Sequence, residues 1–475
     1  MIVKDFLSLR NINFFAIIIG SGPAGICTAL ELERKKIKSL IIEGGDLQQS
    51  DEDLNYLNGK VIGDNYADIS HSRLRQFGGS SGHWGGNCNP MSKENFYDWP
   101  ISKDDLNKYS EKARKILNLN YKEKFYNEKL NNNLNTYNII WSNVKFGEKY
   151  LEHIKKSKYI FLSLRSNLKS LEGSSKSIDL INCQNIDNEI KLKAKYYILS
   201  CGGIENSRIL LWSKKLNKNL FKNELPIGNY YMDHPYYSIG DGLVLYEPFI
   251  NYFKKNNIKN IPILTCNGSL YISANNHFLK KNKILNSGIY IWFQEIGEKN
   301  NLFKQVRCIA PNFIKNIYEN LKIKKKYKIN LSTQQEQSPV FSNKITLGQE
   351  KDPIGKPYPL IYWQKFKSEK KSARIISEEL SKLFIDFNFG RISLNEELYN
   401  DKDYEIVVGN HQMGGTRIGN NIVDSVVDKN LKVHDKDNLF INGSSIFRTG
   451  GHSHPTYTIV KLALRLGEHL SRLNF

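Results

Sequence analysis

The fold is decided by one stretch near the N-terminus, FFAIIIGSGPAGICTALELERKKIKSLIIEGGD, which spans residues 14–46. Residues 14–19 are all apolar, as expected of a short strand that is buried on both faces. Three glycines follow in a G-x-G-x-x-G pattern, and the apolar residues after them recur at helical spacing. A second apolar run, 39–42, ends at a glutamate. The stretch therefore predicts a strand, a glycine turn, a helix and a second strand.

Each part of this pattern suits the binding of a dinucleotide. Gly20 permits a tight turn, Gly22 lets the backbone approach a pyrophosphate, and Gly25 lets helix and strand pack closely. The N-terminus of the helix faces the phosphates, and Glu43, eighteen residues after Gly25, can accept hydrogen bonds from ribose hydroxyls. The pattern predicts a Rossmann-like nucleotide-binding domain, while these residues alone do not separate NAD from FAD.

Length and composition describe a large, basic, globular chain. Its 475 residues suffice for two or three units with their own core, at roughly 150 residues per domain. Lys and Arg outnumber Asp and Glu by 68 to 48, but the excess is spread along the chain, and we find only short basic runs. A spread excess indicates a solvated surface, with attraction to anionic partners or a membrane surface as the alternative. We expect no nucleic-acid partner, because there is no basic stripe.

The cysteines and the apolar runs bear on the compartment. The six cysteines are dispersed without a C-x-x-C pair, which argues against zinc ribbons, iron–sulfur sites and a disulfide scaffold. No apolar run reaches the length of a membrane span. The run that begins at residue 14 is interrupted by glycines and a proline, so we interpret it as a strand, turn and helix rather than a signal peptide. We expect a cytoplasmic protein without a transmembrane segment.

A second motif is the glycine-rich segment RLRQFGGSSGHWGGNCNP, residues 73–90. It contains too much glycine for a helix or a regular strand, and its bare backbone can lie against a flat or charged ligand. His83 and Trp84 project from it. A tight surface turn without a ligand is the alternative interpretation.

The third motif lies near the C-terminus, in NHQMGGTRIG (410–419), NGSS (442–445) and GGHSHPTYTIVKLALRLGEHL (450–470). Pro455 restricts His454 to an extended backbone and suits the first turn of a helix. The pair His452-x-His454 lacks a third ligand at a sensible spacing, so we expect no metal site. A purely structural role for the two histidines, as a cap and a core residue, is the remaining alternative.

The segments 73–90 and 408–470 resemble the glucose–methanol–choline oxidoreductases, which are FAD-dependent alcohol oxidases and dehydrogenases. The resemblance implies FAD as the cofactor and a loop 73–90 that runs along the flavin. In several members, pyranose and choline oxidases among them, a histidine at the position of His83 is joined covalently to the flavin. Both covalent attachment through His83 and a noncovalent histidine beside the ring remain open. Trp84, where many relatives carry Asn, is closer to the sugar-oxidising branch.

The resemblance also implies the catalytic and cofactor-binding residues. His411 matches the first histidine of the family's pair, and His454, 43 residues later, matches the second. It implies that His411 takes the hydroxyl proton, hydride goes to N5 of FAD, and His454 hydrogen-bonds the substrate oxygen, although the two roles can be exchanged. The residues expected to contact the cofactor are Gly20, Gly22, Pro23, Ala24, Gly25, Glu43, Gly78, Gly79, Ser80, Ser81, His83, Trp84, Gly85, Gly86, Gly443, Ser444, Pro455 and Thr456.

The middle of the chain completes the predicted architecture. From residue 236 to 403, alternating runs such as SGIYIWFQEI, NKITL and PLIYWQKF predict an antiparallel sheet, covered by the amphipathic helix SARIISEELSKLFIDF. The expected fold is α/β (α+β overall), with an FAD-binding domain of residues 1–235 and 404–475 and a substrate-binding domain of residues 236–403. We interpret the polar and aromatic segment 121–138 as a lid or a surface excursion, and His234 as a structural residue.

By resemblance, the expected function is oxidation of an alcohol group, of a sugar, glycoside or polyol, with electrons passed to oxygen or to another acceptor. Two alternatives belong to other classes. One is a non-redox lyase on the same flavin fold, in which His411 acts as a base only. The other is a noncatalytic flavoprotein. Reduction of the flavin by a substrate separates the first interpretation from both alternatives.

Overall fold

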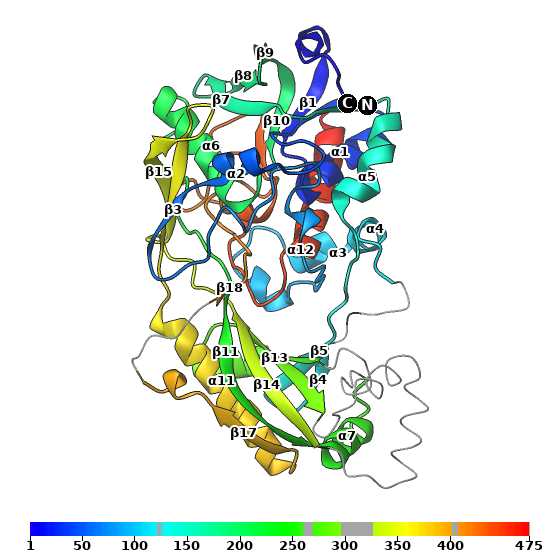
Figure 1. The fold of residues 1–475 in the computed structure, drawn as a ribbon, viewed down its shortest axis with the longest axis vertical. Helices are drawn as coiled ribbons and strands as arrows, with labels where there is room; N and C mark the ends of the chain where they lie inside the picture. The colour runs from blue at the N-terminus through cyan, green and yellow to red at the C-terminus, as the bar shows by residue number, and fades with distance from the viewer. Residues whose placement is uncertain (121–124, 126, 260–268, 296–325, 401–406, 475) are drawn as a thin grey trace.

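The computed structural model describes residues 1–120, 125, 127–259, 269–295, 326–400 and 407–474. The fold is mixed α/β, with a parallel sheet and its helices at one end and a large antiparallel sheet at the other (Figure 1). The two chain ends lie close together beside the parallel sheet (Figure 1). In the described part of the chain, no helix is long and apolar enough to cross a membrane.

The parallel sheet confirms the prediction from residues 14–46. Its strands follow the order β19-β10-β1-β2-β6 and all pair in parallel. These strands are β1 (Phe14–Ile19), β2 (Ser39–Ile42), β6 (Ile160–Ser163), β10 (Ala194–Leu199) and β19 (Leu439–Ile441). The helix α1 (Pro23–Arg34) connects β1 to β2. The carboxyl ends of β1, β2, β10 and β19 therefore meet at one edge, where doubly wound sheets bind their ligands.

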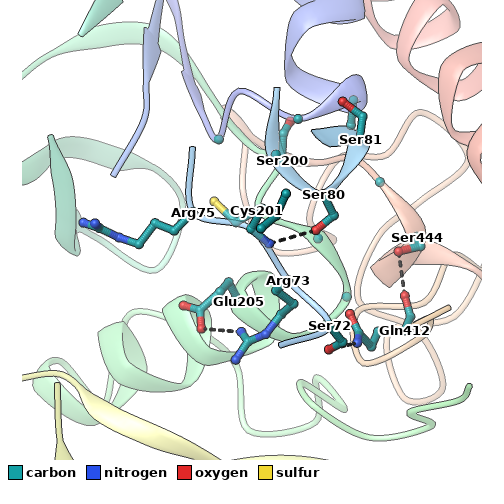
Figure 2. A pocket seen from close by; sticks show the side chains of 18 of the residues that line it. Ser72, Arg73, Arg75, Ser80, Ser81, Ser200, Cys201, Glu205, Gln412 and Ser444 are labelled. Carbon is teal, nitrogen blue, oxygen red and sulfur yellow. Dashed lines mark hydrogen bonds and ion pairs between the residues drawn. The ribbon is translucent and has the colours of Figure 1, made fainter. Parts of the chain in front are cut away.

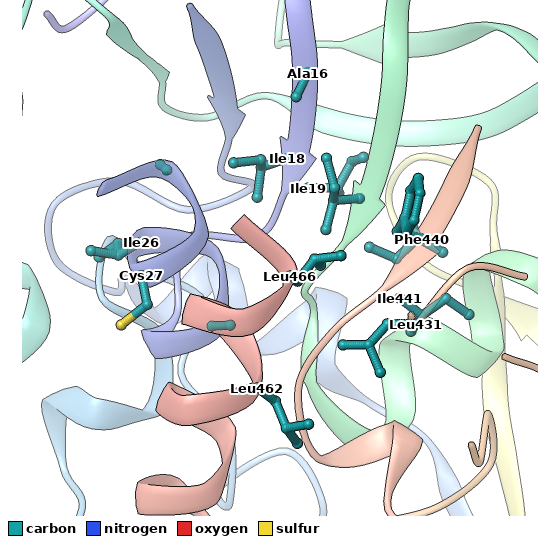
Figure 3. Close-up of a cluster of buried hydrophobic side chains, with 14 of the residues drawn as sticks. Ala16, Ile18, Ile19, Ile26, Cys27, Leu431, Phe440, Ile441, Leu462 and Leu466 are labelled. Atoms are coloured by element: carbon teal, nitrogen blue, oxygen red, sulfur yellow. The ribbon is translucent and has the colours of Figure 1, made fainter. Parts of the chain in front are cut away.

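The C-terminal helix α12 (Thr456–Arg472) packs against α1 beside the parallel sheet (Figure 3). Ile18 of β1, Ile26 of α1 and Leu466 of α12 are fully buried in this core. The two helices approach closely at Gly467, where an added Cβ would lie 2.6 Å from the Cβ of Glu31. This packing holds the N-termini of both helices at the carboxyl edge of the sheet.

In the part of the chain that the structure describes, the antiparallel sheet has eight strands. Seven follow the order β17-β11-β14-β13-β12-β5-β4, and β18 also pairs with β11. They are β4 (Asn127–Lys129), β5 (Leu134–Tyr137), β11 (Pro235–Leu245), β12 (Ser269–Ala274), β13 (Ser287–Glu295), β14 (Lys326–Gln335), β17 (Gly390–Leu394) and β18 (Val407–Val408). The amphipathic helix α11 (Lys367–Asp386) covers it through contacts with β13, β14 and β17. The predicted antiparallel sheet and its helix are confirmed.

Two strand pairings differ from the sequence-based expectations. Residues 127–137 form β4 and β5 of the large sheet rather than a lid or excursion; residues 121–124 and 126 lie outside the described part. The strands β15 (Lys344–Lys351) and β16 (Pro357–Trp363) pair with β3 (Lys60–Gly63) in a separate sheet. Alternation along a strand does not name its partner, so neither pairing is readable from sequence. The sheets cross the boundary predicted at residue 235, and the two-domain division stays a prediction.

The remaining elements frame the parallel sheet or extend from its strands. A three-stranded meander, β7 (Asn167–Gly173), β8 (Ile178–Gln184) and β9 (Glu189–Leu192), joins β6 to β10. The other helices are α2 (Asp51–Leu57), α3 (Lys103–Asn107), α4 (Ser110–Ile116), α5 (Phe146–Lys156), α6 (Gly202–Leu216), α7 (Tyr246–Lys255) and α8 (Asn276–Asn282). The helix α6 begins directly after β10 and contacts both β15 and β16. It therefore links the parallel sheet to the small three-stranded sheet.

Candidate functional site

A cavity of about 680 Å³ lies at the carboxyl edge of the parallel sheet. Its volume is within the range of about 300–1,000 Å³ that is usual for ligand sites. All three sequence motifs line it, together with the predicted catalytic histidines. Figure 2 shows part of the lining, including Ser80 of the glycine-rich loop and Ser444 near the C-terminus. Of the predicted cofactor-binding residues, Gly20, Gly22, Pro23, Ala24, Glu43, Gly79, Ser80, Ser81, His83, Trp84, Gly85, Gly86, Gly443, Ser444, Pro455 and Thr456 line the cavity.

Gly25 and Gly78 do not line the cavity; each lies in a tight backbone packing instead. A Cβ added at Gly25 would lie 2.0 Å from the carbonyl oxygen of Gly20, and one added at Gly78 would lie 2.3 Å from the nitrogen of Gly147. Real Cβ atoms do not approach other atoms so closely. These two glycines support the site by letting backbone segments pack closely, which is the role expected of Gly25.

The backbone around the cavity is bare at several glycines. A Cβ added at Gly22, Gly85 or Gly202 would meet no protein atom within 4 Å. At the N-terminus of α1, the first N–H bonded within the helix is that of Ile26, which donates to Gly22 at 3.0 Å. The N–H groups before it point out of the helix end, where they favour an anion. An extended dinucleotide with a pyrophosphate fits this cradle.

Glu43 is buried and oriented by three donors at the end of β2. Its Oε2 accepts hydrogen bonds from the backbone and hydroxyl of Ser21, at 3.0 and 2.6 Å. Its Oε1 accepts one from the backbone of Gly45, at 2.9 Å. A carboxylate offers about four lone-pair sites, so capacity remains for a ribose hydroxyl.

The loop 73–90 presents His83 and Trp84 to the cavity. The indole nitrogen of Trp84 donates to the carbonyl of Val144 at 2.8 Å, and the ammonium of Lys145 donates to the carbonyl of Trp84 at 3.0 Å. Burial, and then the charge of Lys145, lower the pKa of His83. His83 is therefore a neutral imidazole at about neutral pH. Its neighbour Trp84 is fixed by the two hydrogen bonds to Val144 and Lys145.

The predicted pair His411 and His454 lies together in the cavity wall. Their ring centroids are 4.9 Å apart, with the ring planes at 78°. Burial lowers the pKa of His454 to about 3 and that of His411 well below its usual value, and the neighbouring histidines act in the same direction. Both rings are therefore neutral. Asn87, which the sequence interpretation did not single out, lies with its Nδ2 2.9 Å from the Nε2 of His454.

His452 and His234 lie outside the predicted catalytic pair and differ in their surroundings. The Nδ1 of His452 lies 2.7 Å from the hydroxyl of Tyr271, in the core behind the cavity. The Nδ1 of His234 lies 2.9 Å from the Nδ1 of His411. Within the described ranges, no group of three or more His, Cys, Asp or Glu side chains is arranged to hold a metal ion.

A charged wall that the sequence did not reveal closes another side of the cavity. Arg73 pairs with Glu205 at 3.1 Å, and Arg208 pairs with Asp352 at 2.7 Å (Figure 2 shows the first pair). The fifth member is Lys356, whose ammonium lies 3.9 Å from Glu205. Asp352 and Lys356 belong to the turn between β15 and β16, so the small sheet also reaches the cavity. Arg73 is 132 positions from Glu205, and Arg208 is 144 positions from Asp352, so no local motif predicts these pairs.

The fold and site define a dinucleotide-binding α/β protein whose cavity ends at a pair of neutral histidines. Residues 339–463 match the family model described as GMC oxidoreductase. This match includes most of the segment 408–470, and it agrees with the resemblance that this segment predicted.

Two curated relatives and two solved structures are similar to the chain. It is 24% identical over 283 residues to the fructose dehydrogenase large subunit of Gluconobacter japonicus, covering 58% of this chain and 47% of that protein. It is 33% identical over 138 residues to the 2-methyl-1,2-propanediol dehydrogenase of Mycolicibacterium austroafricanum, covering 29% of this chain and 24% of that protein. The match thus spans about half of the first relative and about a quarter of the second.

The solved structures agree over nearly the whole chain. A pyridoxine 4-oxidase from Mesorbium loti has a TM-score of 0.60 at 14% identity, covering 96% of this chain and 99% of that chain. A formate oxidase has a TM-score of 0.56 at 15% identity, covering 97% and 98%. The formate oxidase of Aspergillus oryzae RIB40 has been studied for the modification of its FAD. At these identities the likeness establishes the fold.

Proposed function

We propose that the protein is an FAD-dependent oxidoreductase that oxidises an alcohol group. The observation that carries the proposal is the pair His411 and His454, two neutral rings 4.9 Å apart in the wall of a dinucleotide cradle. The bare glycine backbone, the N-terminus of α1 and Glu43 would hold the FAD. When bound, FAD supplies the acceptor for the hydride that leaves the substrate carbon.

The histidines divide the proton chemistry. A neutral His411 can remove the hydroxyl proton of the alcohol, and a positioned base is typically worth about 10²–10⁴-fold in rate. His454, whose Nε2 is in contact with Asn87, would hydrogen-bond the substrate oxygen as it becomes a carbonyl. The N-terminus of α12 begins directly after it and favours negative charge at that end of the cavity. Exchange of the two roles is the alternative assignment.

The substrate we propose is a sugar, glycoside or polyol. Two relatives are named for fructose and for a diol, which supports a substrate rich in hydroxyl groups. Their names are those of dehydrogenases, whereas the structural neighbours are oxidases, so both oxygen and another electron acceptor fit.

The test is anaerobic mixing of the FAD-loaded protein with fructose, other sugars, polyols and simple alcohols. At least one of them is expected to bleach the visible flavin absorbance. A flavin that dithionite bleaches but no alcohol does would contradict the proposal, and would favour a lyase or a noncatalytic flavoprotein.

Acid precipitation decides how the flavin is held. Colour that stays with the precipitated protein, and is lost in a His83→Ala variant, identifies His83 as the point of attachment. Colour released to the supernatant makes His83 a noncovalent neighbour of the flavin and leaves the proposed chemistry unchanged.

A further inference from the structure

His234 and His411 face each other through the same ring atom. Their Nδ1 atoms are 2.9 Å apart and their ring planes meet at 81°. Asp233 links the backbones of the two residues. Its Oδ1 accepts hydrogen bonds from the backbone N–H of His234 at 2.7 Å and from that of His411 at 2.8 Å. The side chain of Asp233 is fully buried and receives a third hydrogen bond from Tyr66. The two rings are thus fixed relative to each other.

Two facing Nδ1 atoms at hydrogen-bond distance require that one carries a proton and the other does not. Burial lowers the pKa of His234 to about 4, while its contacts with the backbone of Gly450 and Gly451 act in the opposite direction. The pKa of His411 lies well below its usual value for the same reason. Each ring is therefore neutral, with a single proton on one of its two nitrogens.

Gln334 of β14 decides which ring donates. Its Nε2 donates to the backbone carbonyl of His452 at 2.9 Å, and a carbonyl only accepts, so this contact fixes the orientation of the amide. The same amide nitrogen lies 3.4 Å from the Nδ1 of His234. A donor on that side leaves the Nδ1 of His234 as an acceptor. The shared proton then belongs to the Nδ1 of His411.

We propose that His234 is a positioning residue whose Nδ1 accepts a hydrogen bond from the Nδ1–H of His411. This bond keeps the proton of His411 on Nδ1 and leaves its Nε2 free to take the substrate's proton. The second half of this statement rests on the proposed function. The proton of His234 itself is then on Nε2, which is buried beside Gly450 and makes no hydrogen bond within the described residues. His234 acts on the substrate only through His411.

The first test measures the tautomer directly and needs no turnover. The FAD-loaded protein is labelled with ¹⁵N-histidine, and the ring nitrogens are read by long-range ¹H–¹⁵N correlation at about pH 7. The signals of His411 are assigned by their loss in a His411→Gln variant. We expect the Nδ1-protonated tautomer of His411 and the Nε2-protonated tautomer of His234. An Nε2-protonated His411 overturns the proposal, even if the enzyme oxidises alcohols.

The second test uses two variants of His234. The carbonyl oxygen of Asn occupies roughly the place of the histidine Nδ1, so His234→Asn keeps an acceptor there, whereas His234→Leu removes it. We expect His234→Leu to slow flavin reduction roughly 10²-fold or more, and His234→Asn to recover most of that loss. His277→Leu, at an exposed position on α8, is the matched control.

The pH dependence of flavin reduction distinguishes a positioning role of His234 from a role in packing alone. A charged His234 would lower the pKa of His411, but the neutral ring acts on it as a hydrogen-bond acceptor, which favours the imidazolium of His411. Losing this acceptor should therefore move the acid limb of flavin reduction to lower pH in His234→Leu. The other titratable groups around this pair are His454, His452 and Asp233. An unmoved limb, or equal losses in His234→Asn and His234→Leu when both hold a full complement of FAD, overturns the proposal. If no alcohol reduces the wild-type flavin, the proposed function fails. The tautomer measurement still decides whether His234 accepts the hydrogen bond from His411.

Discussion

Burial gives the histidines at the site their chemical state. In water a histidine is partly protonated near neutral pH, because its ordinary pKa is about 6.5. His411 and His454 lie in the cavity wall with most of their rings surrounded by protein, and this burial lowers the pKa of both. A neutral ring is ready to act as a base without first losing a proton. The neutral state of His411 and His454 therefore follows from the place where the fold brings the two residues together.

Replacing His411 by Ala should slow flavin reduction by roughly 10²–10⁴-fold, since a positioned base contributes about that much. The bound flavin should remain, because the cradle lies on other segments. Anaerobic stopped-flow reduction with the best alcohol measures the effect, and His277→Ala serves as the control. Flavin reduction at the wild-type rate in His411→Ala would remove His411 from the mechanism.

At the residue scale, sequence identified most of the site but not its contacts. The proposed catalytic pair and sixteen of the residues expected to contact the cofactor line the cavity, because local motifs carry them. Their roles there stay predictions. His234 looked structural, since its partner His411 is 177 positions away and no spacing rule joins them. Asn87 stands in a recognised loop, yet only the fold brings it to His454.

At the scale of elements, the N-terminus of α1 separates glycines that face a ligand from glycines that pack. Gly22 has open space where a Cβ would be, and its φ of −68° is ordinary for any residue. Gly25 has a carbonyl oxygen at 2.0 Å from that place. The same substitution should therefore have different consequences at the two positions.

We expect Gly22→Ala to leave the unfolding temperature of the FAD-free protein nearly unchanged and to weaken FAD binding. Gly25→Ala should lower the unfolding temperature as well, because overpacking typically costs about 1–3 kcal/mol. Thermal unfolding with and without FAD, together with titration of FAD, distinguishes the two. Equal stability of both FAD-free variants would contradict the packing role of Gly25.

Elements were predicted well where the pattern is local and poorly where the partner is remote. Residues 14–42 carry their strand, turn and helix signals within one short stretch, and the structure matches them. The strands β4 and β5, and the pairing of β3 with β16, depend on contacts between distant segments. Alternating side chains reveal a strand but contain no information about its neighbour.

At the scale of the whole molecule, buried charge joins the parallel sheet region to the small sheet. The side chains of Arg208 and Asp352 are each 1% exposed, and Arg208 also donates to the backbone carbonyls of Lys356 and Pro357. Burying such a pair is costly, but breaking it is costlier, because one charge then remains without its partner.

Arg208→Met should lower the free energy of unfolding by about 3–5 kcal/mol. Urea denaturation measures the change, with Lys60→Ala as the control. Lys60 pairs with Glu350 at 3.0 Å, but both side chains are more than 70% exposed, so its loss should cost at most about 1 kcal/mol. Similar effects of the two substitutions would mean that the buried pair does not hold these parts together.

Buried neutral histidines also make stability depend on pH. The pKa values of His452 and His454 fall to about 3 and that of His234 to about 4, from 6.5 in the unfolded chain. Below about pH 6.5 the unfolded chain binds more protons, so these histidines reduce stability as the pH falls toward their folded values. Each contributes a slope of at most about 1.4 kcal/mol per pH unit.

His452→Gln should therefore reduce the slope of the free energy of unfolding against pH. The reduction should equal about the contribution of one histidine. Urea denaturation of the wild type and the variant at several pH values between about 7 and 4 gives the two slopes. The difference between them isolates His452, because the buried carboxyl groups are common to both proteins. Parallel slopes would show that His452 is not held neutral in the folded state.

The late position of β19 and α12 sets an order for assembly during synthesis. The strands β1 and β2 leave the ribosome early, but about 400 residues separate the end of β2 from β19, which completes the sheet. At about 5–20 residues per second, that interval lasts roughly 20–80 s. Throughout it, the incomplete cradle has neither Ser444 nor α12 beside it. We therefore expect the complete FAD cradle to form only after α12 has been synthesised.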